Sequence, residues 1–132
     1  GTIINAEATP ELISNIFFNK APLHDGAVIM REGIIYAAGC ILPLSDNPQI
    51  SRELGTRHRA GVGMSENSDA IIVIVSEETG IISMAVGGVL KRNYTMEALR
   101  VALENGMLWD RSHRDKDGEI KTKKPFWRRK SK

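Results

Sequence analysis

Three polar clusters interrupt an otherwise apolar, glycine-rich sequence, and their residue types suit metal or phosphate chemistry. The first cluster is His24-Asp25-Gly26, directly before a predicted strand. An imidazole and a carboxylate at neighbouring positions are ligands for divalent ions, and a glycine lets phosphate or ribose approach the backbone. The alternative is an Asp-Gly turn in which His24 is merely exposed.

The second cluster is Thr56-Arg57-His58-Arg59, between Gly55 and Gly61. Two guanidinium groups at the start of a possible helix suit a polyphosphate, because they bind phosphate oxygens bidentately and the backbone amides add donors. The alternative is a solvated basic patch, although flanking glycines are not what a solvated helix face requires.

The third cluster is Ser76-Glu77-Glu78, at the end of the most apolar predicted strand. Ligand sites in α/β sheets gather beyond the carboxyl ends of strands, so Ser76 could contact phosphate and either glutamate could hold a metal. The alternative is a polar β-turn between adjacent strands.

Together the clusters offer acids for a metal, arginines for phosphates and glycines for close approach. This combination favours phosphoryl or nucleotidyl transfer over hydrolysis through a protein nucleophile. The sequence contains no P-loop, Rossmann glycine pattern, paired metal-ligand cysteines or nucleophile elbow.

The elements that must position these clusters follow from apolar spacing and turn residues. Thr9-Pro10 predicts the start of a helix, and Glu32-Gly33 predicts a hairpin. The expected strands are 28–31, 34–38, 70–75, 81–86 and 89–91, with 70–75 at a sheet centre buried on both faces. A short helix is expected at 50–54, and Thr95 should cap a last helix whose apolar face is Met96, Leu99, Leu103 and Met107.

Residues 56–66 are harder to assign, because Gly61 and Gly63 lower the helix propensity. A helix there is plausible if glycine lets its first turn approach a ligand. The whole pattern predicts an α/β (α+β) fold, a single domain with a central mixed sheet flanked by helices.

Charge divides the chain at residue 109. Residues 110–132 hold ten Lys/Arg and four Asp/Glu, whereas residues 1–109 hold eight and twelve. We therefore predict a catalytic domain at 1–109 and a basic, disordered tail at 110–132. Because the positive charge belongs to the tail, nucleic acid is not expected as the main partner. Cys40 is the only cysteine and is expected to be a buried thiol, and no apolar run could cross a bilayer.

At this point the sequence resembles the diadenylate cyclase domain family. Its hallmark motifs stand here as Asp25-Gly26-Ala27 and Arg57-His58-Arg59, within the strings PLHDGAVI, LPLS, ELGTRHRA and VSEETG. The resemblance covers residues 9–108. Within the family, the sequence is most similar to the membrane-anchored branch. It implies that two ATP molecules are condensed into cyclic di-AMP and two pyrophosphates, with Mg²⁺, Mn²⁺ or Co²⁺, across a face-to-face homodimer.

The resemblance also implies roles for individual residues. Asp25 would hold the metal and orient the attacking 3′-hydroxyl, and Glu78 is preferred to Glu77 as a further ligand. His58 would either face a phosphate or brace its loop. The expected sets are catalytic residues Asp25, Arg57, His58 and Arg59; ATP-binding residues Gly26, Ala27, Leu42, Thr56, Arg57, Ser76 and Glu77; and metal ligands His24, Asp25 and Glu78.

Two departures from the family stand out. Ile41 occupies a position where relatives often carry an aromatic residue that can stack on adenine. A helix and a strand that the family places upstream are expected to be missing, which could expose a sheet edge. The parent protein is expected at the cytoplasmic face of a bacterial membrane, attached only through segments outside this chain.

Two other functions are compatible with parts of the sequence. One is a catalytically inactive nucleotide-binding regulatory module, against which the intact Asp25 and the Arg57 motif argue. The other is an interaction protein whose tail, with Phe126 and Trp127 among basic residues, contacts anionic lipid head groups or an acidic partner.

Overall fold

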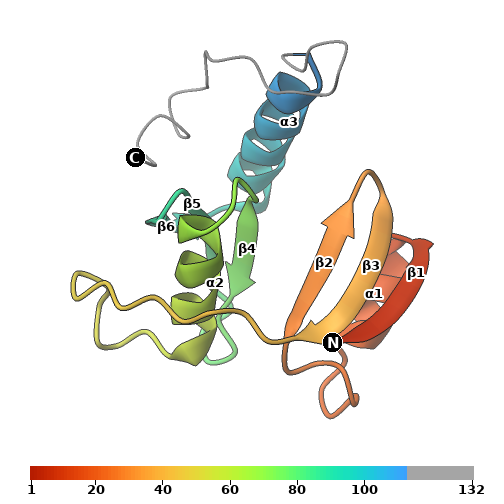
Figure 1. Cartoon of the computed structure of the whole chain (residues 1–132), viewed down its shortest axis with the longest axis horizontal. Coiled ribbons are helices and arrows are strands. Elements are labelled where there is room, and N and C mark those ends of the chain that lie inside the picture. The colour runs from red at the N-terminus through yellow and green to blue at the C-terminus, as the bar shows by residue number, and fades with distance from the viewer. Residues whose placement is uncertain (113–132) are drawn as a thin grey trace. The chain divides into compact units, whose positions relative to one another are not determined.

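The computed structural model describes residues 1–112, and these form two compact units, Gly1–Pro43 and the segment from Leu44 onward. Each unit contains its own three-stranded sheet (Figure 1). The predicted α+β class is confirmed. All strand pairs among the described residues are antiparallel, because tight hairpins join most neighbours and parallel pairing needs a long crossover.

The first unit is built from four elements: β1 (Thr2–Glu7), α1 (Pro10–Ile16), β2 (Ala27–Arg31) and β3 (Ile34–Cys40). The sheet order is β1-β3-β2, and α1 packs on one face of it (Figure 1). The buried core there consists of Ile16, Ile35 and Ala38. Thr9 caps α1 as predicted, since its hydroxyl accepts a hydrogen bond from the Leu12 N–H at 3.1 Å.

The predicted hairpin between β2 and β3 is confirmed. Glu32 and Gly33 have φ angles of 52° and 80°, the left-handed pair that a two-residue hairpin turn with matching twist requires. The first strand, β1, is not evident from the sequence. Asn5 has a φ of 52°, and the register shifts between Ile3 and Ala6, so a bulge hides the alternation that marks a strand.

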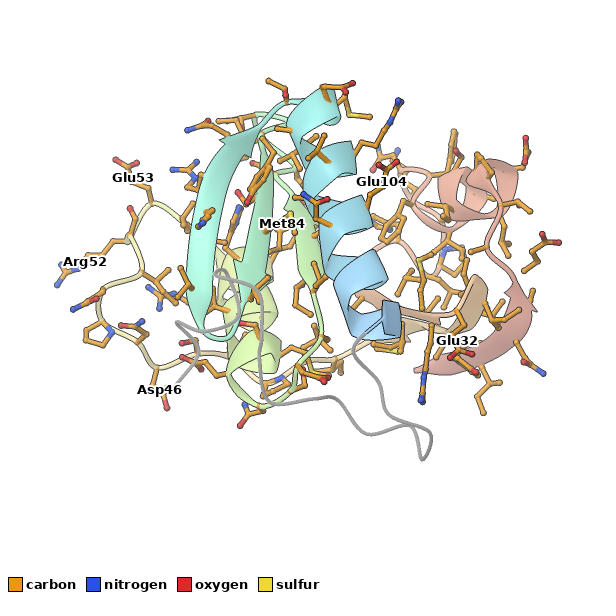
Figure 2. All side chains as sticks on the ribbon, turned by 90° about the horizontal axis from the view of Figure 1, so that it is seen from above. Glu32, Asp46, Arg52, Glu53, Met84 and Glu104 are labelled. Atoms are coloured by element: carbon orange, nitrogen blue, oxygen red, sulfur yellow. The ribbon has the colours of Figure 1, made fainter. Side chains whose placement is uncertain are left out.

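The second unit contains α2 (Thr56–Glu66), β4 (Ile72–Val75), β5 (Ile82–Val86), β6 (Val89–Tyr94) and α3 (Met96–Ser112). The sheet order is β4-β5-β6. The sheet lies between α2 and α3, and Figure 2 shows Met84 of β5 on the side that faces α3. The core between α2 and the sheet is formed by Ile50, Leu54, Val62, Ile74 and Ala85.

Within the second unit, the strand predicted at a sheet centre lies at the edge of the three-stranded sheet. Among the described strands, β4 pairs only with β5, and Val73 and Val75 remain 41% and 47% exposed. Ile74 is the buried residue of β4, and it packs in the core under α2.

Residues 50–54 form turns rather than the predicted short helix. Side-chain oxygens of Ser45, Asn47 and Ser51 each accept a hydrogen bond from a backbone N–H two residues later. Such local bonds compete with helix formation, while Ile50 and Leu54 still anchor the segment in the core.

Residues 56–66, for which the sequence does not decide between helix and loop, form α2. Gly61 does not provide room for a ligand there. A Cβ added at Gly61 would lie 2.8 Å from the Ile74 side chain. The glycine therefore lets α2 pack closely on β4, rather than letting a ligand approach.

The last helix is capped as predicted, because Thr95 Oγ1 accepts a hydrogen bond from the Ala98 N–H at 3.0 Å. On its predicted apolar face Leu99 and Leu103 are half-buried, whereas Met96 is exposed. α3 continues to Ser112, which makes the first three residues of the predicted tail helical. The rest of that tail, with Phe126 and Trp127, lies outside the described residues. Over the part of the chain that is described, no helix is long and apolar enough to span a membrane.

Candidate functional site

The first polar cluster lies in the loop that leads into β2. The Asp25 side chain is exposed, and His24 is half-buried. His24 Nδ1 lies 2.8 Å from the Ala21 carbonyl oxygen. A carbonyl can only accept, so Nδ1 must carry the proton and Nε2 of a neutral ring keeps a free lone pair. A histidine fixed in this way through one nitrogen is typical of metal ligands.

Gly26 has a structural reason to be glycine. A Cβ added there would lie 2.7 Å from the Gly39 backbone, so the loop crosses β3 more closely than any side chain allows. The neighbouring strand accounts for this glycine without a ligand. Ala27 then opens β2, where it pairs with Cys40. Leu42, the predicted adenine contact, is half-buried.

The second cluster forms the first turn of α2. Gly55 is the N-cap and offers no side-chain hydrogen bond to the helix, so the backbone donors of this turn lack the usual serine or aspartate partner. Thr56 is exposed beside them. The helix N-terminus also carries a partial positive charge, and this turn is therefore suited to an anion.

Arg57 connects the second and third clusters. Its Nη1 donates to the Val75 carbonyl oxygen at 3.0 Å, and its Nη2 forms an ion pair with Glu77 Oε1. The Arg57 and Glu77 side chains are 35% and 61% exposed, so the pair is reachable from solvent. The structure therefore brings together two residues that the sequence could only place 20 positions apart.

Ser76 organises the turn after β4. Its hydroxyl accepts hydrogen bonds from the Glu78 and Thr79 N–H groups, each at 3.3 Å. Its backbone pairs with Ile81 and Gly80. The polar-turn alternative is thus realised in the geometry. The side chain of Glu78 is exposed at the tip of this turn.

His58 and Arg59 differ from Arg57 in their surroundings. His58 is only 6% exposed. Burial, with the positive charges of Arg92 and Arg57, lowers the pKa of His58 below its ordinary value of 6.5. Arg59 is half-buried, and its carbonyl oxygen accepts a hydrogen bond from Ser45 N at 3.0 Å.

Several residues that support the site were missed from the sequence. Ser45 is buried and donates a hydrogen bond to Glu66 at 2.9 Å, which joins the preceding loop to α2. Arg92 affects the charge of His58. The LPLS string contains Ser45, but only the three-dimensional contact shows what it binds.

The predicted metal ligands His24 and Asp25 belong to the first unit and Glu78 to the second. Over the described residues, neither unit by itself gathers three His, Cys, Asp or Glu side chains.

These two units, one with a carboxylate loop and one with an arginine-bearing helix start, fit an α+β nucleotide-binding domain. Comparison with known proteins gives the family. Residues 1–90 match the family described as DisA bacterial checkpoint controller nucleotide-binding, and the chain belongs to it.

Individual relatives agree with this assignment. The chain is 57% identical over 104 residues to the cyclic di-AMP synthase CdaA of Bacillus subtilis, which is 79% of this chain and 38% of that protein. It is 50% identical over 103 residues to a diadenylate cyclase of Listeria monocytogenes, again 38% of that protein. The chain thus spans about two fifths of these relatives.

A solved structure has the same fold. The crystal structure of DacA from Staphylococcus aureus superposes with a TM-score of 0.78 at 48% identity, and covers 80% of this chain and 70% of that one. A structure described as a hypothetical membrane spanning protein from Bacillus cereus gives a TM-score of 0.70 at 48% identity, over 72% of this chain and 47% of that one.

Proposed function

We propose that this chain is the catalytic part of a diadenylate cyclase. It would join two ATP molecules into cyclic di-AMP and release two pyrophosphates. Relatives that are 57% and 50% identical to this chain over 104 and 103 residues are named cyclic di-AMP synthase and diadenylate cyclase. The observation that carries the proposal to this chain is the α2 start, where an arginine and uncapped backbone donors form an anion site of the kind a triphosphate needs.

In this proposal Arg57, Arg59 and Thr56 hold the triphosphate, with Ser76 and Glu77 beside them. Arg57 is already oriented by Val75 O and Glu77. An arginine held in place before the reaction stabilises developing charge without reorganisation. Gly26, Ala27 and Leu42 would contact the nucleoside part. The burial of His58 supports the bracing role rather than direct contact with a phosphate.

A divalent ion fits the donors on the first loop. Asp25 offers an exposed carboxylate, and the His24 Nδ1 contact leaves Nε2 with its lone pair. We propose these two residues as ligands of Mn²⁺, Mg²⁺ or Co²⁺, with Glu78 as a third. When bound, the ion would acidify a hydroxyl and offset phosphate charge. Asp25 itself would orient the attacking 3′-hydroxyl.

The reaction also implies a homodimer. Each new bond joins the 3′-oxygen of one ATP to the α-phosphorus of the other, and pyrophosphate leaves. One chain with one triphosphate site holds half of the reacting pair, so two copies must face each other. Because one relative is described as membrane spanning, we further propose that the parent protein is anchored in a membrane, with this part on the cytoplasmic face where ATP is available.

The experiment is incubation of the purified chain with ATP and Mn²⁺, followed by chromatography for cyclic di-AMP. We expect product whose initial rate rises more than in proportion to chain concentration, because the active species is a dimer. A parallel reaction with chelator should give none. Bound ATP with no product at high chain concentration would instead identify an inactive nucleotide-binding module.

A further inference from the structure

Two buried side-chain atoms have no hydrogen-bond partner among the described residues: His58 Nε2 and Ser83 Oγ. His58 is 6% exposed and Ser83 is fully buried. Buried polar atoms in native proteins are nearly always paired, because an unpaired one loses its bonds to water and gains nothing in return. Two such atoms therefore require an explanation, and Ser83 is not part of the proposed ATP site.

Both atoms face the same interface, between α2 and the sheet β4-β5-β6. Ser83 is the cross-strand partner of Ile74, and directly opposite residues of an antiparallel pair point to the same face. Ile74 touches α2 at Gly61. His58 lies one helical turn before Gly61 and is buried with it on that side of α2.

The α2 start is aligned with the same end of the sheet. Arg57 donates to the carbonyl oxygen of Val75, the last residue of β4, and Val75 pairs with Ile82, the neighbour of Ser83. His58 and Ser83 thus lie at the same level of the interface as well as on the same face.

The charges around His58 decide which way a hydrogen bond between them would run. The charged groups that act on the ring are Arg92 of β6 and Arg57 of α2, both of which only donate. β5 is the central strand of its sheet, and Ser83 lies where the register between β5 and β6 shifts. The Ser83 hydroxyl has no partner among the described residues, and the lone pair of a neutral imidazole is an acceptor on the same face.

We propose that Ser83 is a positioning residue for His58. Its hydroxyl binds one water that donates a hydrogen bond to His58 Nε2, and so holds the ring with its proton on Nδ1. This fixes the first turn of α2, on which Arg57 and Arg59 are carried. The effect on catalysis rests on the proposed function, whereas the hydrogen bond and the tautomer do not.

Side-chain ¹⁵N NMR tests the proposal on the ¹⁵N-labelled chain. Only three histidines are present, and the His58 signals are assigned by their loss in His58→Gln. At pH 7.5 we expect wild-type His58 to be neutral, with Nε2 unprotonated and Nδ1 protonated. A proton on Nε2 would overturn the proposal, and the tautomer itself is read on the wild-type chain.

The variant Ser83→Ala is compared with Ser65→Ala. Ser65 is a matched control, because it is buried in the same interface and bonds Val62 O and Gly88 N at 2.7 and 2.9 Å. We expect Ser83→Ala to give a mixture of both tautomers and a roughly tenfold lower kcat, by analogy with the smaller losses seen when the partner orienting a metal-bound histidine is removed. Ser65→Ala should lose stability and keep the wild-type tautomer.

If the His58 tautomer is unchanged in Ser83→Ala, Ser83 does not position His58 and the proposal is wrong. Ser83→Thr keeps the hydroxyl and should keep the tautomer. Because the NMR signals do not depend on turnover, an inactive chain with the expected tautomer would count against the proposed function alone.

Discussion

The loop around Asp25 and the turn around Arg57 are held in place by different means. Within the first unit, the loop position follows from backbone packing, since Gly26 lies against Gly39 and the Asp25 side chain is exposed. In the second unit, side chains position one another, because Arg57 binds Val75 O and Glu77, and Ser45 joins the preceding loop to α2 through Glu66.

This difference separates the two regions experimentally. A change of the Asp25 side chain removes a charged group and leaves the packing of the loop intact, whereas a change at Gly26 acts first on that packing. Around Arg57 the supports and the proposed ligands are the same side chains, so that function and stability should change together.

The largest effect is expected for Asp25→Asn. The amide keeps the shape of an exposed side chain but loses the charge that would hold a cation and orient a hydroxyl. We expect kcat to fall by at least about 100-fold, the loss typical of removing a group that acts directly in proton transfer or charge stabilisation. The thermal midpoint should stay the same. Cyclic di-AMP formation and thermal unfolding measure the two, and Asp46→Asn in the exposed loop (Figure 2) is the control.

Turnover by Asp25→Asn at a rate near that of the wild type would remove Asp25 from the site. A large drop in thermal midpoint would show instead that the Asp25 carboxylate supports the fold, and the contrast between the two regions would be lost.

Gly26→Ala should cause the second largest effect, and mainly on stability. The new Cβ would lie 2.7 Å from the Gly39 backbone, and overpacking of this kind destabilises by about 1–3 kcal/mol. Gly33→Asn is the matched control in the same sheet: nothing lies within 4 Å of an added Cβ, and asparagine tolerates the φ of 80°. Urea unfolding followed by circular dichroism measures both. Equal stability of the two variants would contradict the close crossing.

These glycines illustrate what the sequence could and could not predict. Thr9, Glu32-Gly33 and Thr95 predicted a helix start, a hairpin and a cap because each acts within a few residues. Gly26 and Gly61 were interpreted as room for a ligand, but each accommodates a strand distant in sequence. A glycine in the sequence indicates that another group packs closely against the backbone, but it does not indicate whether that group is a ligand or another part of the chain.

The site shows the same limit. The sequence contains both hallmark motifs, and these predicted the diadenylate cyclase family. It did not predict the partners of Arg57, because Glu77 and Val75 O meet it only after α2 packs along β4. It left α2 undecided because the buried face of this helix is His58, Gly61, Val62, Gly63 and Ser65, which has little apolar periodicity to detect.

A smaller effect is expected from pH on the second unit. The pKa of His58 is lowered by burial and by Arg92 and Arg57, so the unfolded chain binds this proton more readily than the folded one. The contribution of neutral His58 to stability is complete above pH 6.5 and is lost as the pH falls below it. Urea unfolding between pH 5 and 7.5 measures it. In His58→Gln this part of the slope should vanish, and an unchanged slope would assign it to other groups.

The smallest effect is expected for Glu77→Gln. The pair with Arg57 is partly exposed, and such pairs contribute less than about 1 kcal/mol. The glutamine oxygen can still accept from Arg57, and the bond to Val75 O remains. We therefore expect little change in unfolding free energy and a KM for ATP raised only severalfold, with Glu53→Gln, exposed in Figure 2, as the control. A loss as large as that of Asp25→Asn would mean that Glu77 acts on the reacting groups themselves. The Asp25 loop and the turn around Arg57 would then both act directly in the reaction. The difference in how the two regions are held in place would concern the fold alone.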